Sequence, residues 1–196
     1  MSLIGEQLAE EWLNRQGFFT IRGVKVGNGE MDLLAVKQDK GNIECWHFEV
    51  QLSLRPVSYI CPAPKELRRA GKSPHNASKR STDEAKQAVK EWLEKKYFDP
   101  EKDQVRSRLW PGKWKFGFIV GNVRHHDELD LISAEGVKVF HMVDHLQHLS
   151  PLRSKNGGRF ILEAASGADL LDLVFAQEQL KKEIVNEVVD ELKREH

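Results

Sequence analysis

The hydrophobic pattern of the first 54 residues predicts a helix followed by a β-meander. Apolar side chains recur at helical spacing over residues 3–15, and Gly17 follows where a helix C-cap is expected. Short apolar runs bounded by turn residues, including an Asn-Gly pair at 28–29, then predict strands over residues 18–26, 31–38 and 43–54. The chain therefore opens in the order α-β-β-β.

The remaining pattern adds helices and two further strands. Residues 53–80 are rich in proline and cations, which predicts a loop or a short helix between loops. A helix capped by Ser81 or Thr82 follows, then strands over 114–122 and 136–142, a short helix after Asp144, and a long helix over 168–196. The order α-β-β-β-α-β-β-α predicts an α/β fold with a central mixed sheet flanked by helices.

Composition and length predict one folded domain with an extension. The 196 residues are 40% hydrophobic and include five Trp and nine Phe, which suffices for a sizeable core. We place the domain at residues 1–160 and a helical extension at 161–196, whose apolar stripe packs on the core or forms a homodimer interface. Two cysteines exclude a disulfide framework. Without a signal peptide or an apolar run long enough for a membrane span, we expect a soluble cytoplasmic protein.

The net charge of zero conceals a basic segment. Thirty Lys and Arg balance thirty Asp and Glu, which excludes a strongly basic nucleic-acid binder as a description of the whole chain. Residues 52–82 nevertheless hold seven cations and one acid. We expect these seven cations to contact phosphates, the alternative being a solvated polar loop: Arg55, Lys65, Arg68, Arg69, Lys72, Lys79 and Arg80.

Two acidic residues on neighbouring predicted strands are the candidate chemical centre. Glu49 and Gln51 share one face of their strand, and Asp32 meets Glu49 if the two strands are adjacent. A buried unpaired carboxylate is costly, and Mg²⁺ bound by one or two carboxylates and water would offset that cost. Such a metal could activate water for attack on phosphorus. The alternative is a pair of ordinary solvated acids.

Four short motifs in fixed order carry a resemblance to a known family. They are Gly5-Glu6-x-x-Ala9, Gly17-Phe18, Gly29-Glu30-Met31-Asp32-Leu33-Leu34-Ala35 and Phe48-Glu49-Val50-Gln51. Together they cover about the first 52 residues and resemble the PD-(D/E)xK nuclease superfamily, most closely the archaeal Holliday-junction resolvases and YraN-like bacterial proteins. The resemblance implies a restriction-endonuclease-like fold and a DNA endonuclease that uses Mg²⁺, or Mn²⁺ in its place.

The resemblance also assigns roles to individual residues. It implies that Asp32 and Glu49 bind the metal, that Glu6 is the additional helix glutamate, and that Gln51 stands where the family has a catalytic lysine. A neutral amide can only hydrogen-bond. This departure favours, as the alternative, an inactive nuclease-fold protein that binds nucleic acid or assembles a complex. If the resemblance is accidental, the chain is a protein-interaction module built around its terminal helix.

Two further residues are accessory candidates. Glu30 is expected to be a turn residue that faces away from Asp32, with at most an indirect contact to the metal. Gln87 lies on the helix that follows the basic segment, from which a polar side chain can approach the site in related nucleases.

Overall fold

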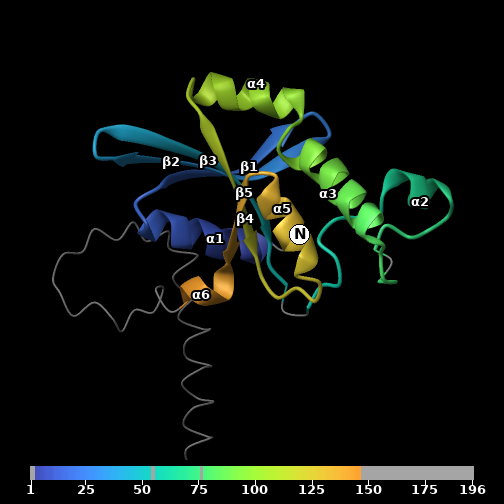
Figure 1. The fold of residues 1–196 in the computed structure, drawn as a ribbon. Coiled ribbons are helices and arrows are strands. Elements are labelled where there is room, and N and C mark those ends of the chain that lie inside the picture. Colours follow the sequence, from blue (N-terminus) through green and yellow to red (C-terminus); the bar gives the residue numbers. More distant parts are fainter. Residues whose placement is uncertain (1–2, 54–55, 76, 147–196) are drawn as a thin grey trace, which may run out of the picture.

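A five-stranded mixed sheet forms the centre of the protein. The computed structural model describes residues 3–53, 56–75 and 77–146 (Figure 1). The strands lie in the order β1-β2-β3-β4-β5, where β1–β3 form an antiparallel meander and β4 and β5 run parallel to β3. Their bounds are β1 (Phe19–Val26), β2 (Gly29–Asp39), β3 (Asn42–Gln51), β4 (Trp114–Val120) and β5 (Val137–His141). The predicted α/β class with a mixed sheet is confirmed.

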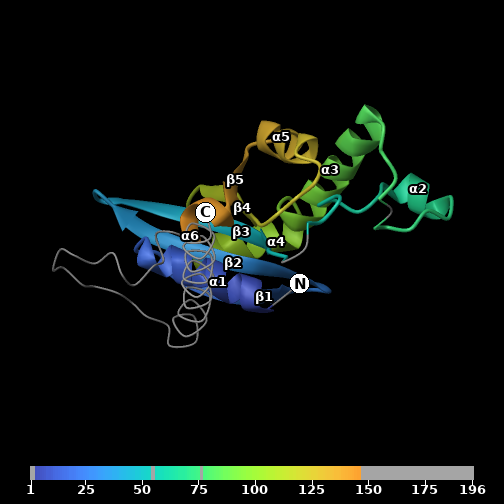
Figure 2. The same cartoon turned by 90° about the horizontal axis from the view of Figure 1, so that it is seen from below.

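Helices cover both faces of this sheet (Figures 1 and 2). One face carries α1 (Leu3–Arg15) and α6 (Met142–Leu146), and the other carries α3 (Thr82–Lys96), α4 (Pro100–Leu109) and α5 (Asp127–Ala134). The short helix α2 (Lys65–Arg69) lies at the periphery beside α3. No helix within the described ranges is both long and apolar enough to cross a bilayer.

Alternation along the central strands builds a separate core on each face. Phe48 and Val50 of β3 point toward α1, where they pack with Trp12 and Leu13. On the opposite face Phe118 of β4 joins a core completed by α3 and α5. The strand therefore leaves His47 and Glu49, which alternate with Phe48 and Val50, on the face of α3 and α4.

Capping residues explain where the helices over the site begin. Ser81 accepts a hydrogen bond from the Glu84 N–H, and the Glu84 carboxylate accepts one from the Ser81 N–H, so the two form a capping box at the start of α3. Asp99 caps α4 through the Glu101 N–H, with Pro100 in the first helical position. Because α3 ends at Lys96 and α4 begins at Pro100, the end of α3 lies close to the start of α4 in the chain.

The hydrophobic pattern predicted neither α4 nor α5. The buried residues of α4 are Lys102 and Arg106, so the helix has no apolar stripe to detect. The predicted extension over 161–196, and with it the domain boundary at 160, lies outside the described residues. The segment over 53–80 agrees with the expected short helix between loops, because its described part contains only α2 as regular helix.

Candidate functional site

Asp32 and Glu49 come together across the antiparallel pair β2 and β3. The register pairs Leu33 with Phe48, so the next position on each strand holds one of the two carboxylates. Each is 1% exposed. The Val50 N–H donates to Asp32 Oδ2 at 2.8 Å, whereas Asp32 Oδ1 is buried without a hydrogen-bond partner. Asp32 Oδ1 therefore has no hydrogen bond, although it forms a long ion pair with Lys96.

The electrostatics of Asp32 reflect this crowding of negative charge. Burial, followed by the charge of Glu49, raises the pKa of Asp32 from 3.8 to about 7, although Lys96 and the Val50 N–H oppose the shift. Keeping Asp32 ionised therefore costs free energy of folding, and a bound cation would reduce this cost.

Stability should consequently depend on pH through Asp32. The folded state keeps the Asp32 proton up to about pH 7, and the unfolded chain releases it near 3.8. The protonated Asp32 therefore contributes to the free energy of unfolding. This contribution is fully present below the pKa of Asp32 in the unfolded chain and is lost as the pH rises through its pKa in the folded protein, a loss of about 4 kcal/mol. We expect Asp32→Asn to remove this loss in urea unfolding measured with a chelator between roughly pH 4 and pH 8. Equal pH slopes in the two proteins would contradict the assignment.

Two lysines from the α3–α4 segment supply positive charge to this pair. Lys96 forms an ion pair with Glu49 Oε2 and lies with its Nζ 3.8 Å from Asp32 Oδ1. Burial alone would lower the pKa of Lys96, but the charges of Glu49 and Asp32 outweigh it and raise that pKa. Lys102 Nζ lies 3.4 Å from Glu49 Oε1 and donates to the backbone oxygens of Glu30 and Lys96. Both oxygens of Glu49 thus face an ammonium group.

A buried histidine and arginine extend the network behind Glu49. Arg106 lies 3.0 Å through a guanidinium nitrogen from His47 Nδ1, and His47 Nε2 lies 3.1 Å from Glu49 Oε1. Because a guanidinium only donates, Nδ1 is the acceptor and Nε2 carries the proton that is donated to Glu49. Burial, with the positive charges of Arg106 and Lys102, lowers the pKa of His47 well below 6.5. His47 is therefore neutral and fixes the position of Glu49.

A cavity of about 610 Å³ lies beside Asp32, lined by residues of α1, the β1–β2 hairpin and the α3–α4 segment. Glu6 of α1 lines it together with Asp32, and burial and the charges of Asp32 and Glu30 raise the pKa of Glu6. Glu30 lines it as well, so the expectation that Glu30 faces away from Asp32 is wrong. Residues two apart on a strand share a face. Glu30 also forms an ion pair with Lys25 at the surface.

The two amides predicted for the site lie at different distances from it. Gln51 is half-buried at the end of β3, on the face of Glu49 by strand alternation, and its backbone oxygen accepts from the Gly121 N–H. Gln87 is exposed and donates to Glu91. It lies nine residues before Lys96, about 13 Å along the axis of α3, so the structure does not bring it to the carboxylates.

The basic segment divides into exposed and sequestered cations. Lys65, Arg69 and Lys79 are exposed, while Arg68 and Lys72 are exposed and paired with Glu91 and Glu84. Arg55 lies outside the described residues.

Arg80 corrects the expectation of a free phosphate-binding cation. Its side chain is 5% exposed, pairs with Glu128 of α5 at 3.1 Å and lies 3.9 Å from the ring centre of Tyr59. It also donates to the backbone oxygen of Cys61. Arg80 therefore ties the basic segment to α5 and presents no charge to a nucleic acid.

Sequence reasoning missed the cations and the histidine that complete the site. Lys96 looks like a solvent-exposed helix residue, and Lys102 and Arg106 belong to α4, which was not predicted. The available signals were the Asp99-Pro100 start of α4 and the alternation that places His47 on the face of Glu49. Over the described part of the chain, no three His, Cys, Asp or Glu side chains are placed to hold a metal ion between them.

Comparison with known proteins leaves the family open. No protein-family model and no curated protein sequence matches the chain. A solved structure with a distant likeness is that of AF1548, a protein of unknown function, with 13% sequence identity and a TM-score of 0.41. The aligned region covers 74% of this chain and 65% of that one, so this chain spans less than two thirds of that protein's length.

Proposed function

We propose that this chain is a divalent-metal-dependent DNA endonuclease with a restriction-endonuclease-like core. The observation that carries the proposal is the convergence of two buried carboxylates, Asp32 and Glu49, with the ammonium of Lys96 beside an open cavity. The proposal is also supported by the order of the first elements, since α1 is followed by an antiparallel meander that bears both acids, as predicted from the sequence.

The residues present fit Mg²⁺ better than a metal that needs a closed protein cage. Asp32 and Glu49 would hold it, and the buried Oδ1 of Asp32, which has no hydrogen-bond partner, is the ligand atom that supports this assignment. Mg²⁺ commonly takes one or two carboxylates and keeps several waters. A pair of acids therefore suffices, and Mn²⁺ would serve as a substitute.

The metal would supply a polarised phosphoryl oxygen and a bound water of lowered pKa. Lys96 is placed to neutralise negative charge on the phosphate, because its side chain is 22% exposed and reaches both carboxylates. Gln51 can orient the attacking water through its amide. Lys96 would thus provide the positive charge that Gln51 lacks, and Glu6 would support the site from the cavity wall.

Exposed cations of the basic segment would hold the nucleic-acid backbone. Lys65, Arg69 and Lys79 are exposed on the segment that follows β3, and each phosphate they neutralise adds salt-dependent affinity. Their contribution would be independent of base sequence.

A second candidate function is nucleic-acid binding without cleavage. The observation that favours it is the pairing of both Glu49 oxygens with Lys96 and Lys102, which balances the charge of Glu49 without a metal. In that case the fold would retain a nuclease core and bind DNA in a salt-sensitive manner.

Nicking of supercoiled plasmid by the full chain separates the two functions. We expect nicking with Mg²⁺ or Mn²⁺, and none with EDTA or with Ca²⁺, which binds carboxylates but supports such chemistry poorly. Salt-sensitive DNA binding without nicking in either active metal would refute the endonuclease and support the second function. Nicking that persists in EDTA would refute the metal-dependent mechanism.

A further inference from the structure

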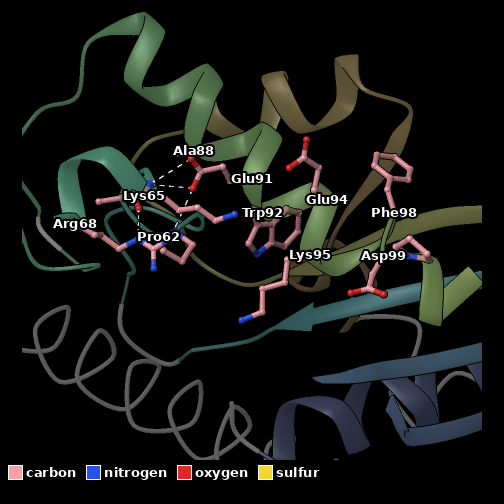
Figure 3. Close-up of a pocket in the computed structure, with 12 residues that line it drawn as sticks. Pro62, Lys65, Arg68, Ala88, Glu91, Trp92, Glu94, Lys95, Phe98 and Asp99 are labelled. Atoms are coloured by element: carbon pink, nitrogen blue, oxygen red, sulfur yellow. Dashed lines mark hydrogen bonds and ion pairs between the residues drawn. The ribbon is translucent and has the colours of Figure 1, made fainter. Parts of the chain in front are cut away.

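A second cavity lies at the end of α3, on the side opposite the cavity that Asp32 lines. It has a volume of about 380 Å³ and lies between the α2 segment and α3 (Figure 3). Pro62, Ala88 and Trp92 contribute apolar wall, and Phe98 stands at its edge with 46% of its surface exposed. The ring of Phe98 is held edge-on by Phe116 at a centroid distance of 5.4 Å. An exposed, fixed aromatic face beside a cavity is suited to stacking.

This second cavity adjoins the cavity of the proposed active site. Lys95 and Asp99 line both of them, and Lys96, the next residue after Lys95, reaches Asp32 and Glu49. A group bound in the second cavity would therefore be a near neighbour of a phosphate at the carboxylates.

The lining favours a flat heterocycle with hydrogen-bonding groups on its edge. Its walls are apolar and aromatic, while Glu94 and Asp99 offer carboxylate acceptors for the N–H groups of a nucleobase. Lys65 and Lys95 on the rim are exposed cations that can contact the phosphates attached to it. Aromatic stacking combined with a cationic rim is how unpaired nucleotides are bound.

We propose that this cavity receives one unpaired nucleobase of the strand that is cut, so that the substrate is single-stranded or locally unpaired nucleic acid. The inference rests on the proposed endonuclease function and names its substrate class. A base inside a duplex is stacked and paired, and it must leave the helix to enter a concave site. An intact duplex therefore binds more weakly than the same strand alone.

Fluorescence anisotropy with the full chain tests this pocket without cleavage. The probes are a fluorescein-labelled 12-nucleotide DNA, the RNA of the same sequence and the DNA duplex, all measured in EDTA. We expect the single strand to bind about tenfold tighter than the duplex, and Phe98→Ala to weaken the single strand about tenfold. Phe98→Trp should retain affinity. Phe19→Ala is the matched control, because Phe19 is an exposed phenylalanine on β1 that lines neither cavity.

Abasic substitution in the probe gives a readout that does not depend on folding of a variant. Removing one base in turn along the DNA should identify a position whose loss weakens binding about tenfold in the wild type and has little effect in Phe98→Ala. The DNA and RNA arms show which sugar the strand carries.

The outcomes separate the pocket from the endonuclease. Equal affinity for single strand and duplex, or equal affinity of the Phe98→Ala and Phe19→Ala proteins for the single strand, overturns the pocket even if plasmid is nicked. Conversely, binding of the single strand that depends on Phe98, in a protein that nicks no DNA with Mg²⁺ or Mn²⁺, supports the pocket and refutes the endonuclease.

Discussion

Replacing Asp32 with asparagine should lower Mg²⁺-dependent nicking about a thousandfold while leaving the folded protein at least as stable as the wild type. Asparagine removes the charge that would bind the metal. Its carbonyl oxygen can still accept the hydrogen bond that the Val50 N–H donates to Asp32 Oδ2 at 2.8 Å in the wild type. Because burial and Glu49 raise the pKa of Asp32 to about 7, a buried ionised Asp32 destabilises the folded protein at and above neutral pH, and asparagine removes this destabilisation. Initial rates of nicking and urea unfolding at pH 8 measure the two effects.

Replacing Glu49 should have a different effect on stability from replacing Asp32. Glu49→Gln should also abolish nicking, but it leaves Lys102, which is buried, without its carboxylate partner. Removing one partner of a buried ion pair costs several kcal/mol, so this variant should unfold at lower urea. Glu44→Gln is the matched control, since Glu44 lies on the same strand and pairs with Lys115 at the surface. Full activity in Asp32→Asn would refute the assignment of the site.

Local sequence signals were sufficient for the meander and for the meeting of its two acids. Strand alternation predicted that Asp32 meets Glu49 if their two strands are adjacent. The observed pairing of Leu33 with Phe48 shows that the strands are adjacent and places the two acids across from each other. The predicted separation of Glu30 from Asp32 failed because the same alternation was not applied to it. Periodicity is reliable here because apolar side chains mark the buried face of each strand.

The cations of the site could not be predicted because their burial depends on distant partners. Lys102 and Arg106 occupy buried positions on α4 where the hydrophobic pattern of a helix would place apolar residues. Their burial is possible because Lys102 donates to Glu49 and Arg106 donates to His47. Arg80 is sequestered by Glu128, which lies 48 residues further along the chain. The number of cations in a basic segment of a sequence therefore does not show which of them are exposed to solvent.

Lys96→Met should reduce nicking about a hundredfold, because it removes the ammonium that would neutralise the phosphate and keeps a side chain of similar length. Lys96 reaches Glu49 and Asp32 from the last turn of α3. Lys90→Met is the control, since Lys90 is an exposed lysine of the same helix that lines neither cavity. Initial rates at saturating Mg²⁺ measure the loss, and a rate equal to that of Lys90→Met would contradict the role of Lys96.

Gln51→Lys in the Lys96→Met background should recover at least about tenfold of that loss. Gln51 lies two residues after Glu49 on β3, so a lysine there projects to the same face and returns an ammonium to the side of Glu49 from the strand instead of the helix. In the wild-type background the same substitution adds a second ammonium and should change the rate little. Recovery confined to the Lys96→Met background would show that one positive charge is required and that either element can supply it. Failure to recover, in a double variant that is folded and binds Mn²⁺, would mean that Lys96 holds the carboxylates in place and does not act on the phosphate.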